Sequence, residues 1–237
     1  MALRKPVAVG GALVGGALAA WIVTFVRMRG MDAGPGADLG GLGWYLGIWV
    51  TMTAAMMLPA TAPMVIVFGR VSRERARHRS LPALPTWIFL AGYLVAWTLY
   101  GLVAYGLDHG ARSAAPYLQD ERYAAGVALV AAGLYELTPL KGVCLRRCRH
   151  PIHFVHAGWR DGWGGALRMG SEHGLYCVGC CWGLMLALFA LGVMNIAWMA
   201  AIAIVIFVQK VFPLGDRLAP VVAATLVAVA AWVVVSP

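Results

Sequence analysis

Residues 174–192 read GLYCVGCCWGLMLALFALG, an apolar stretch whose first turns carry three cysteines. A helix needs about 20 apolar residues to cross the roughly 30 Å hydrocarbon core of a bilayer. Comparable stretches recur along the chain, and the predicted spans are 7–26, 43–68, 84–106, 122–140, 175–192, 196–209 and 218–235. The sequence therefore predicts about seven transmembrane helices, and at least six.

The composition supports the same fold class. Of the 237 residues, 61% are hydrophobic and 12% are charged, and the mean hydropathy is +0.76. Soluble domains carry about 25% charged residues. Lipid favours helices because each helix satisfies its own backbone hydrogen bonds, and the short alternating segments typical of a membrane barrel are missing. We expect an all-α, polytopic transmembrane helical bundle, with residues 1–237 forming a single integral membrane domain.

The positive charges predict a topology. The formal net charge is +9, and fifteen of the nineteen lysines and arginines lie at the N-terminus or in every second connection. Such residues concentrate on the cytoplasmic side of a membrane. We therefore expect a cytoplasmic N-terminus and an external C-terminus. This topology accounts for the positive net charge, so nucleic-acid binding is not needed to explain it. The expected partner is the lipid bilayer, and we expect no nucleic-acid partner.

The five cysteines fall into two groups. Cys144 and Cys148 follow the fourth predicted span, whereas Cys177, Cys180 and Cys181 begin the fifth. The predicted topology places both groups at the cytoplasmic leaflet. In a helix, the spacing of the second group puts its three thiols on one face. Thiolates bind soft metals, so we expect one shared metal site. The alternative is that the cysteines are small apolar residues in helix contacts.

The choice of metal depends on the number of ligands. Cu(I) is satisfied by two or three thiolates and is the ion that we favour. Zinc remains possible, and a structural zinc site would take four ligands. His173 lies one turn before Cys177 on the same helix face, and His150 follows Cys148 closely. Either imidazole would complete the ligand set.

Methionines offer softer ligands in the second span. The stretch TMTAAMMLPATAPM, residues 51–64, contains Met52, Met56 and Met57. Thioethers at helical spacing bind Cu(I), and a row of them leading to the thiols would provide a route for the ion. The alternative is that these methionines are flexible filler in the helix core.

Glu136 is the only acidic residue inside a predicted span. Intramembrane acids are costly and are often functional. The alternatives are a local ion pair between Glu136 and Lys141, or a side chain that reaches the nearby interface. Thr138 and Pro139 are predicted to kink this span.

Three motifs carry a resemblance to a known family. They are AMMLPATAP at 55–63, YELTPLKGVCLRRCRHP at 135–151 and GLYCVGCCWGLM at 174–185. Over about residues 44–208 the chain resembles a bacterial family of predicted metal-binding integral membrane proteins, a domain of unknown function. The resemblance implies a multi-pass protein of the bacterial inner (cytoplasmic) membrane, with metal bound at the matching motif residues. It implies no mechanism.

Three functions fit these features. The first is Cu(I) binding at the cysteines, for metal handling or transport, with handover to a membrane or metallochaperone protein partner. The second is an enzyme, either a thiol/disulfide oxidoreductase using Cys177 and Cys180 or a cuproenzyme. The third is a subunit of a larger membrane complex that holds structural zinc. The chain has no phosphate-binding loop and no HExxH motif, so neither an ATPase nor a zincin is indicated.

Overall fold

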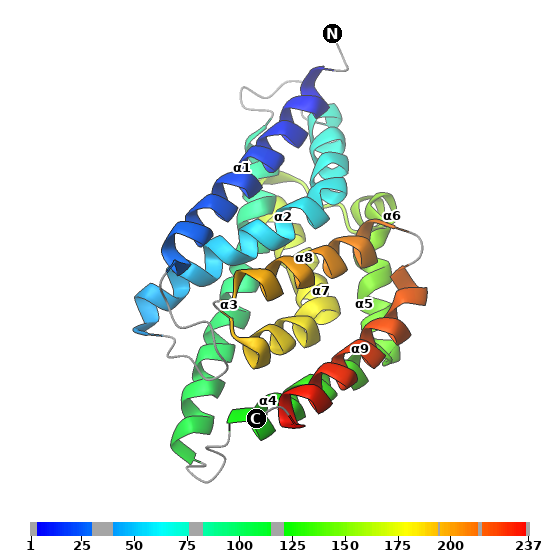
Figure 1. The fold of residues 1–237 in the computed structure, drawn as a ribbon. Helices are drawn as coiled ribbons and strands as arrows, with labels where there is room; N and C mark the ends of the chain where they lie inside the picture. Colours follow the sequence, from blue (N-terminus) through cyan, green and yellow to red (C-terminus); the bar gives the residue numbers. More distant parts are fainter. Residues whose placement is uncertain are drawn as a thin grey trace.

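The computed structural model describes residues 4–29, 40–75, 83–114, 121–193, 195–212 and 215–235. Across these ranges the regular secondary structure is helix throughout, and the helices form one bundle (Figure 1). The helices are α1 (Arg4–Met28), α2 (Leu42–Arg75), α3 (Leu84–Ala114), α4 (Glu121–Glu136), α5 (Pro139–Arg149), α6 (Pro151–Ala157), α7 (Gly162–Leu191), α8 (Ile196–Val211) and α9 (Gly215–Val235). The predicted all-α class is confirmed.

Five of the described helices are long and apolar enough to cross a membrane, namely α1, α2, α3, α7 and α9. Helices α4 and α5 also qualify when taken together, although they meet at an angle of 65°. Helix α8, which corresponds to the sixth predicted span, has 16 residues and is shorter. The described chain therefore supports five spans, or six if the bent pair counts as one.

The interior of the bundle is built from α2 and α7. Their apolar windows are 56% and 61% buried inside the protein, against 17% for α1 and for α9. Helix α1 runs alongside α2 on one side of the bundle, and α9 runs alongside α4 on another (Figure 1). The outer helices leave apolar side chains exposed, as lipid contact requires.

The break between α4 and α5 is encoded locally. Thr138 has an extended backbone and caps α5, and its hydroxyl accepts a hydrogen bond from the Lys141 amide at 3.4 Å. Pro139 follows at the first helical position, where its missing N–H costs nothing. The predicted kink is confirmed, and it turns α5 back toward the body of the bundle.

Helix α7 is longer than predicted. It begins at Gly162, whereas the predicted span began at residue 175, so the start predicted from hydropathy is wrong by about 20 Å of helix. The added segment carries Arg168 and Glu172, which lower its hydropathy, but these two side chains pair on one face at 3.0 Å. The other face buries Ala166 and Met169 in the core.

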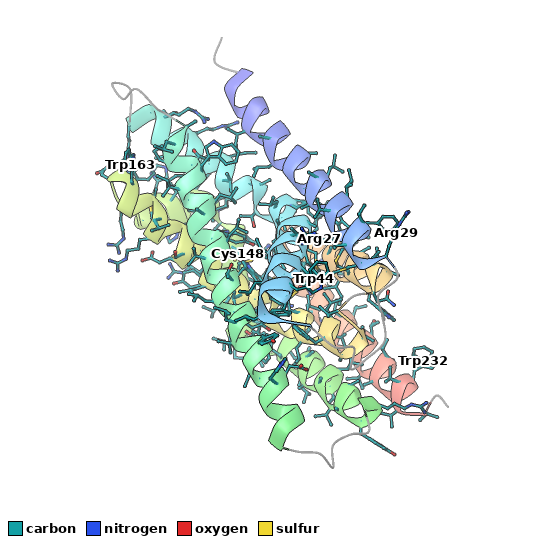
Figure 2. The ribbon with its side chains drawn as sticks, turned by 90° about the vertical axis from the view of Figure 1, so that its left-hand side faces the viewer. Arg27, Arg29, Trp44, Cys148, Trp163 and Trp232 are labelled. Atoms are coloured by element: carbon teal, nitrogen blue, oxygen red, sulfur yellow. The ribbon has the colours of Figure 1, made fainter. Side chains whose placement is uncertain are left out.

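This extension changes where the cysteines lie on their helix. Cys177 is near the middle of α7 rather than in its first turn. In Figure 2, Cys148 lies at mid-length of the bundle, while Trp163 marks one end of α7. The thiols are therefore surrounded by protein on both sides along the helix axis.

Helices α3 and α7 cross at close range. A Cβ atom placed on Gly174 would lie 2.6 Å from the Cβ of Ala96 and 2.9 Å from the carbonyl oxygen of Tyr93. Only a glycine permits this approach, which is the usual role of small residues in membrane helix contacts. The crossing brings the Tyr93 side chain to the turn of α7 that contains Cys177.

Candidate metal centre

The two groups of cysteines lie together in the structure. The sulfur atoms of Cys148 on α5 and Cys180 on α7 are 3.9 Å apart, and those of Cys180 and Cys181 are 3.3 Å apart. The Cys144 sulfur lies against the backbone of α7 at Gly179. We call Cys144, Cys148, Cys177, Cys180 and Cys181 the sulfur cluster. Residues 29 or more positions apart in the sequence thus share one region of the bundle, between α5 and α7.

Gly179 makes this approach possible. A Cβ atom at this position would lie 2.7 Å from the Cys144 sulfur, closer than real Cβ atoms come to other atoms. The carbonyl of Gly179 accepts a hydrogen bond from the Tyr135 hydroxyl at the end of α4. The Tyr135 ring in turn lies 4.5 Å from that of Trp182, measured between centroids. The α4–α5 break is thereby fixed to α7 beside the thiols.

Cys177 has two polar neighbours from other helices. The Lys210 ammonium on α8 donates a hydrogen bond to its sulfur at 2.7 Å. The Tyr93 hydroxyl on α3 is 3.0 Å from the same sulfur. All three side chains are buried. A buried ammonium is costly without a negative partner, so the Cys177 thiolate is the natural form of this contact.

Lys210 is a functional candidate that the sequence reasoning missed. It lies one residue beyond the predicted span 196–209, so the charge count that predicts the topology includes it among the cations of the following connection. In the structure α8 continues to Val211, starting from Asn195, whose side-chain oxygen accepts from the amides of its first turn. The available signal was the adjacent polar pair Gln209 and Lys210 at the end of an apolar run, since polar residues at membrane depth are often functional.

Glu136 and Lys141 form an ion pair, as one of the sequence alternatives proposed. The Lys141 ammonium also donates to the Gln209 side-chain oxygen at 2.8 Å, and the Gln209 amide donates to the second Glu136 oxygen at 2.9 Å. Each of the three side chains is at most 3% exposed. We call Glu136, Lys141 and Gln209 the buried polar triad. It connects the α4–α5 break to α8, one residue from Lys210.

His173 is buried one turn before Cys177. Its ring stacks on Tyr93 and Phe89, with centroids 5.7 Å and 6.0 Å away. Within the described chain its Nδ1 atom has no hydrogen-bond partner. A buried, unpaired ring nitrogen on the cysteine face of α7 is a ready donor for a soft metal.

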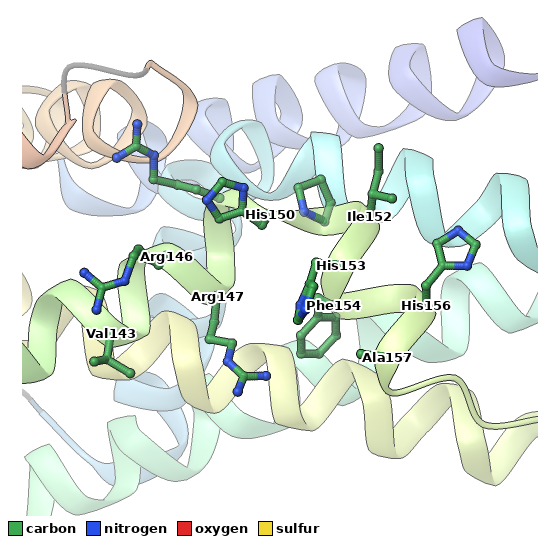
Figure 3. Close-up of a pocket in the computed structure, with 11 residues that line it drawn as sticks. Val143, Arg146, Arg147, His150, Ile152, His153, Phe154, His156 and Ala157 are labelled. Atoms are coloured by element: carbon green, nitrogen blue, oxygen red, sulfur yellow. The ribbon is translucent and has the colours of Figure 1, made fainter.

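The contacts described above include none of the other predicted ligands. Met52, Met56 and Met57 are all buried in α2, and their role as ligands stays a prediction. His150 is exposed at the corner between α5 and α6, where it lines a surface groove (Figure 3). The sulfur contacts given above come from α3, α5, α7 and α8.

The geometry favours sulfur pairs over a preformed polyhedron. In the described residues, no three His, Cys, Asp or Glu side chains are arranged as a metal site. The sulfur separations of 3.9 Å and 3.3 Å are nevertheless shorter than about 4.6 Å, twice a thiolate–metal bond. One ion can therefore bridge either pair.

Comparison with known proteins gives one match. A family model described as PpoB2, copper chaperone, matches residues 46–233. No curated protein and no solved structure gives a significant match. The matched region runs from α2 to α9 and includes the whole sulfur cluster, the buried polar triad and Lys210.

Proposed function

Because the chain belongs to the PpoB2 copper chaperone family, we propose that it is an integral protein of the bacterial inner membrane that binds Cu(I) at the sulfur cluster and hands it to another metal-handling protein. The observation that carries this proposal is the 3.9 Å separation between the sulfur atoms of Cys148 and Cys180. These thiols come from different helices, so the fold itself assembles the pair.

The first argument for Cu(I) is coordination. Soft thiolates favour Cu(I), and a site for transfer benefits from few ligands, since each one must be released. The pairs Cys148/Cys180 and Cys180/Cys181 provide this low coordination number. Zinc is less well supported, because a structural zinc site takes four ligands in a tetrahedron.

The second argument is charge. When Cys177 is one of the two thiolate ligands, those thiolates and one Cu(I) ion carry a net charge of −1, which the Lys210 ammonium beside Cys177 balances. Two thiolates and a divalent ion are already neutral, so the same lysine would leave a buried charge of +1. Uncompensated charge in a buried site is costly. Charge balance therefore supports a monovalent ion.

The third argument is the gradient of burial across the cluster. Cys144 and Cys148 are half-buried, whereas Cys177, Cys180 and Cys181 are at most 3% exposed. Cys180 lies between the half-buried Cys148 and the buried Cys177, to whose carbonyl it donates at 3.2 Å. The ion therefore enters and leaves the site at Cys148 and is held away from solvent at Cys177. Cys180 serves as a ligand at both positions.

His173 is the best candidate for an additional ligand. It lies on the cysteine face of α7, and its ring is held by Tyr93, which also contacts Cys177. The neutral imidazole adds no charge, so the balance with Lys210 is unchanged by its binding. His150 is assigned no role in this site, since it faces the surface groove.

The test is the metal content of anaerobically purified protein after exposure to Cu(I) or zinc. We expect wild-type protein to retain copper in preference to zinc, and the Cys148→Ser/Cys180→Ser variant to lose most of it. Ser171→Ala is the matched control, because Ser171 lies on α7 and its hydroxyl donates to the Gly92 carbonyl on α3, away from the sulfur atoms. Full copper retention by the double serine variant, or preference for zinc in the wild type, would refute the proposal.

A further inference from the structure

A basic groove lies on the surface at the corner between α5 and α6. Its volume is about 1080 Å³. Six basic side chains line it, namely Arg146, Arg147, Arg149, His150, His153 and His156. None of the described residues that line it is acidic. The groove lies outside the sulfur cluster and has no part in the function proposed above.

The shape of the groove follows from the sequence. His150 ends α5 and precedes α6, and Pro151 occupies the first position of α6. Proline cannot donate to the preceding turn, so the helix breaks and the chain changes direction. In Figure 3, Arg147, His153 and Phe154 project into the angle between the two helices, above α7. The angle is therefore both concave and basic.

The charge in the groove is only partly compensated inside the protein. Within the described residues, Arg146 and Arg147 form no ion pair, and Arg147 lies over the Tyr176 ring at 5.6 Å. Arg149 donates to the Phe212 carbonyl at 2.7 Å. Two guanidinium groups therefore remain available to an anion, and guanidinium is the side-chain group best matched to phosphate oxygens.

The groove is also apolar. Ile152 is 65% exposed and Val143 is 46% exposed, and both line it. A hydrophilic anion would gain nothing from these side chains. A ligand with a phosphate and hydrocarbon chains would use both, with the phosphate at the arginines and a chain along the apolar wall. Basic pockets beside membrane helices on the cytoplasmic side bind anionic headgroups in this way.

We propose that the α5–α6 groove binds one anionic phospholipid, with its phosphate held by Arg147 and its neighbours and its two acyl chains against Val143 and Ile152 at the two ends of the groove. Helix α5 carries Cys144 and Cys148 as well as the arginines. The lipid and the sulfur cluster therefore contact the same short helix. A bound phospholipid stabilises the position of α5 in the bundle.

The experiment compares lipid retention by purified protein. Protein in detergent is incubated with equal amounts of phosphatidylglycerol and phosphatidylcholine, and bound lipids are counted by native mass spectrometry. We expect selective retention of one phosphatidylglycerol. The Arg146→Gln/Arg147→Gln variant should lose about 25-fold in affinity, since each basic residue near an anionic surface contributes about fivefold.

The matched control is Arg160→Gln/Arg168→Gln. It removes the same charge, but these arginines pair with Glu172 on α7, away from the groove. The control should retain phosphatidylglycerol, and Arg146→Lys/Arg147→Lys should recover part of the binding, which excludes misfolding as the cause. Copper content measured on the same samples should be unchanged, so this proposal fails or holds independently of the copper site.

Three results would overturn the proposal. The first is equal retention of the two lipids by wild-type protein. The second is a loss in the control variant that matches the loss in the groove variant, because this would reflect net charge alone. The third is displacement of phosphatidylglycerol by millimolar inorganic phosphate, which would make the groove a site for a free anion.

Discussion

Replacing Lys141 by methionine removes one partner of the buried polar triad and nearly preserves side-chain volume. In the wild-type protein the ammonium contacts both Glu136 and Gln209, and the side chains of Lys141 and Glu136 are 2% and 1% exposed. After the substitution, the Gln209 amide is the one donor that the Glu136 carboxylate keeps among the described residues. The variant therefore buries a charge without a counter-charge.

The expected cost is about 3–5 kcal/mol, the range measured when one partner of a buried ion pair is removed. For a chain of this size, 1 kcal/mol corresponds to about 2–4 °C in melting temperature, so the loss should be about 6–20 °C. The Glu136→Gln/Lys141→Met double variant removes both charges and leaves two amides that hydrogen-bond to each other. It should melt at a higher temperature than Lys141→Met alone.

The assay is thermal unfolding in detergent, followed by tryptophan fluorescence at one scan rate, with copper content measured in parallel. A melting temperature within about 2 °C of wild type for Lys141→Met, or a double variant less stable than both single variants, would refute this reasoning. If the double variant recovers stability but not copper binding, the Glu136–Lys141 ion pair acts in function as well as in folding.

Two further predictions concern the sulfur cluster itself. Gly179→Ala should lower copper retention, because the new Cβ would lie 2.7 Å from the Cys144 sulfur and push α5 away from α7. The control is Gly164→Ala on the same helix, where a Cβ meets no described atom within 4 Å. This control should leave copper retention unchanged. Lys210→Met should weaken Cu(I) binding by at least about tenfold, as expected when a charge-assisted hydrogen bond to Cys177 is lost, and should shift the metal preference toward zinc. Competition with a Cu(I) chelator measures both effects, and an unchanged affinity in either variant would contradict the role given to that residue.

Several features of the protein follow from local sequence signals. The apolar stretches and sparse charge predict helices, because lipid leaves no other way to satisfy the backbone. The spacing of Cys177, Cys180 and Cys181 predicts their common face, because a helix repeats every 3.6 residues. Thr138 and Pro139 predict the break before α5. Each of these depends on neighbours within one or two turns, and the structure agrees with all of them.

The start of α7 shows where local signals fail. The hydropathy of residues 162–174 is lowered by Arg168 and Glu172, yet these side chains pair with each other on the outer face of a continuous helix. A hydropathy average over a window of residues counts both charged side chains but ignores the helix face on which they lie. The helix therefore begins thirteen residues before the apolar stretch does.

The sequence by itself determined a helical membrane bundle, a cysteine-bearing helix face and a kink just before the Cys144/Cys148 pair. Only the tertiary structure decided that Lys210 and Tyr93 reach Cys177, that Gly179 admits Cys144, and that Gln209 completes the contacts of Glu136. The physical reason is that lipid-facing and buried faces of a membrane helix are both apolar. Periodicity therefore does not show which sides of two helices meet, and contacts between distant helices are set by their crossing geometry.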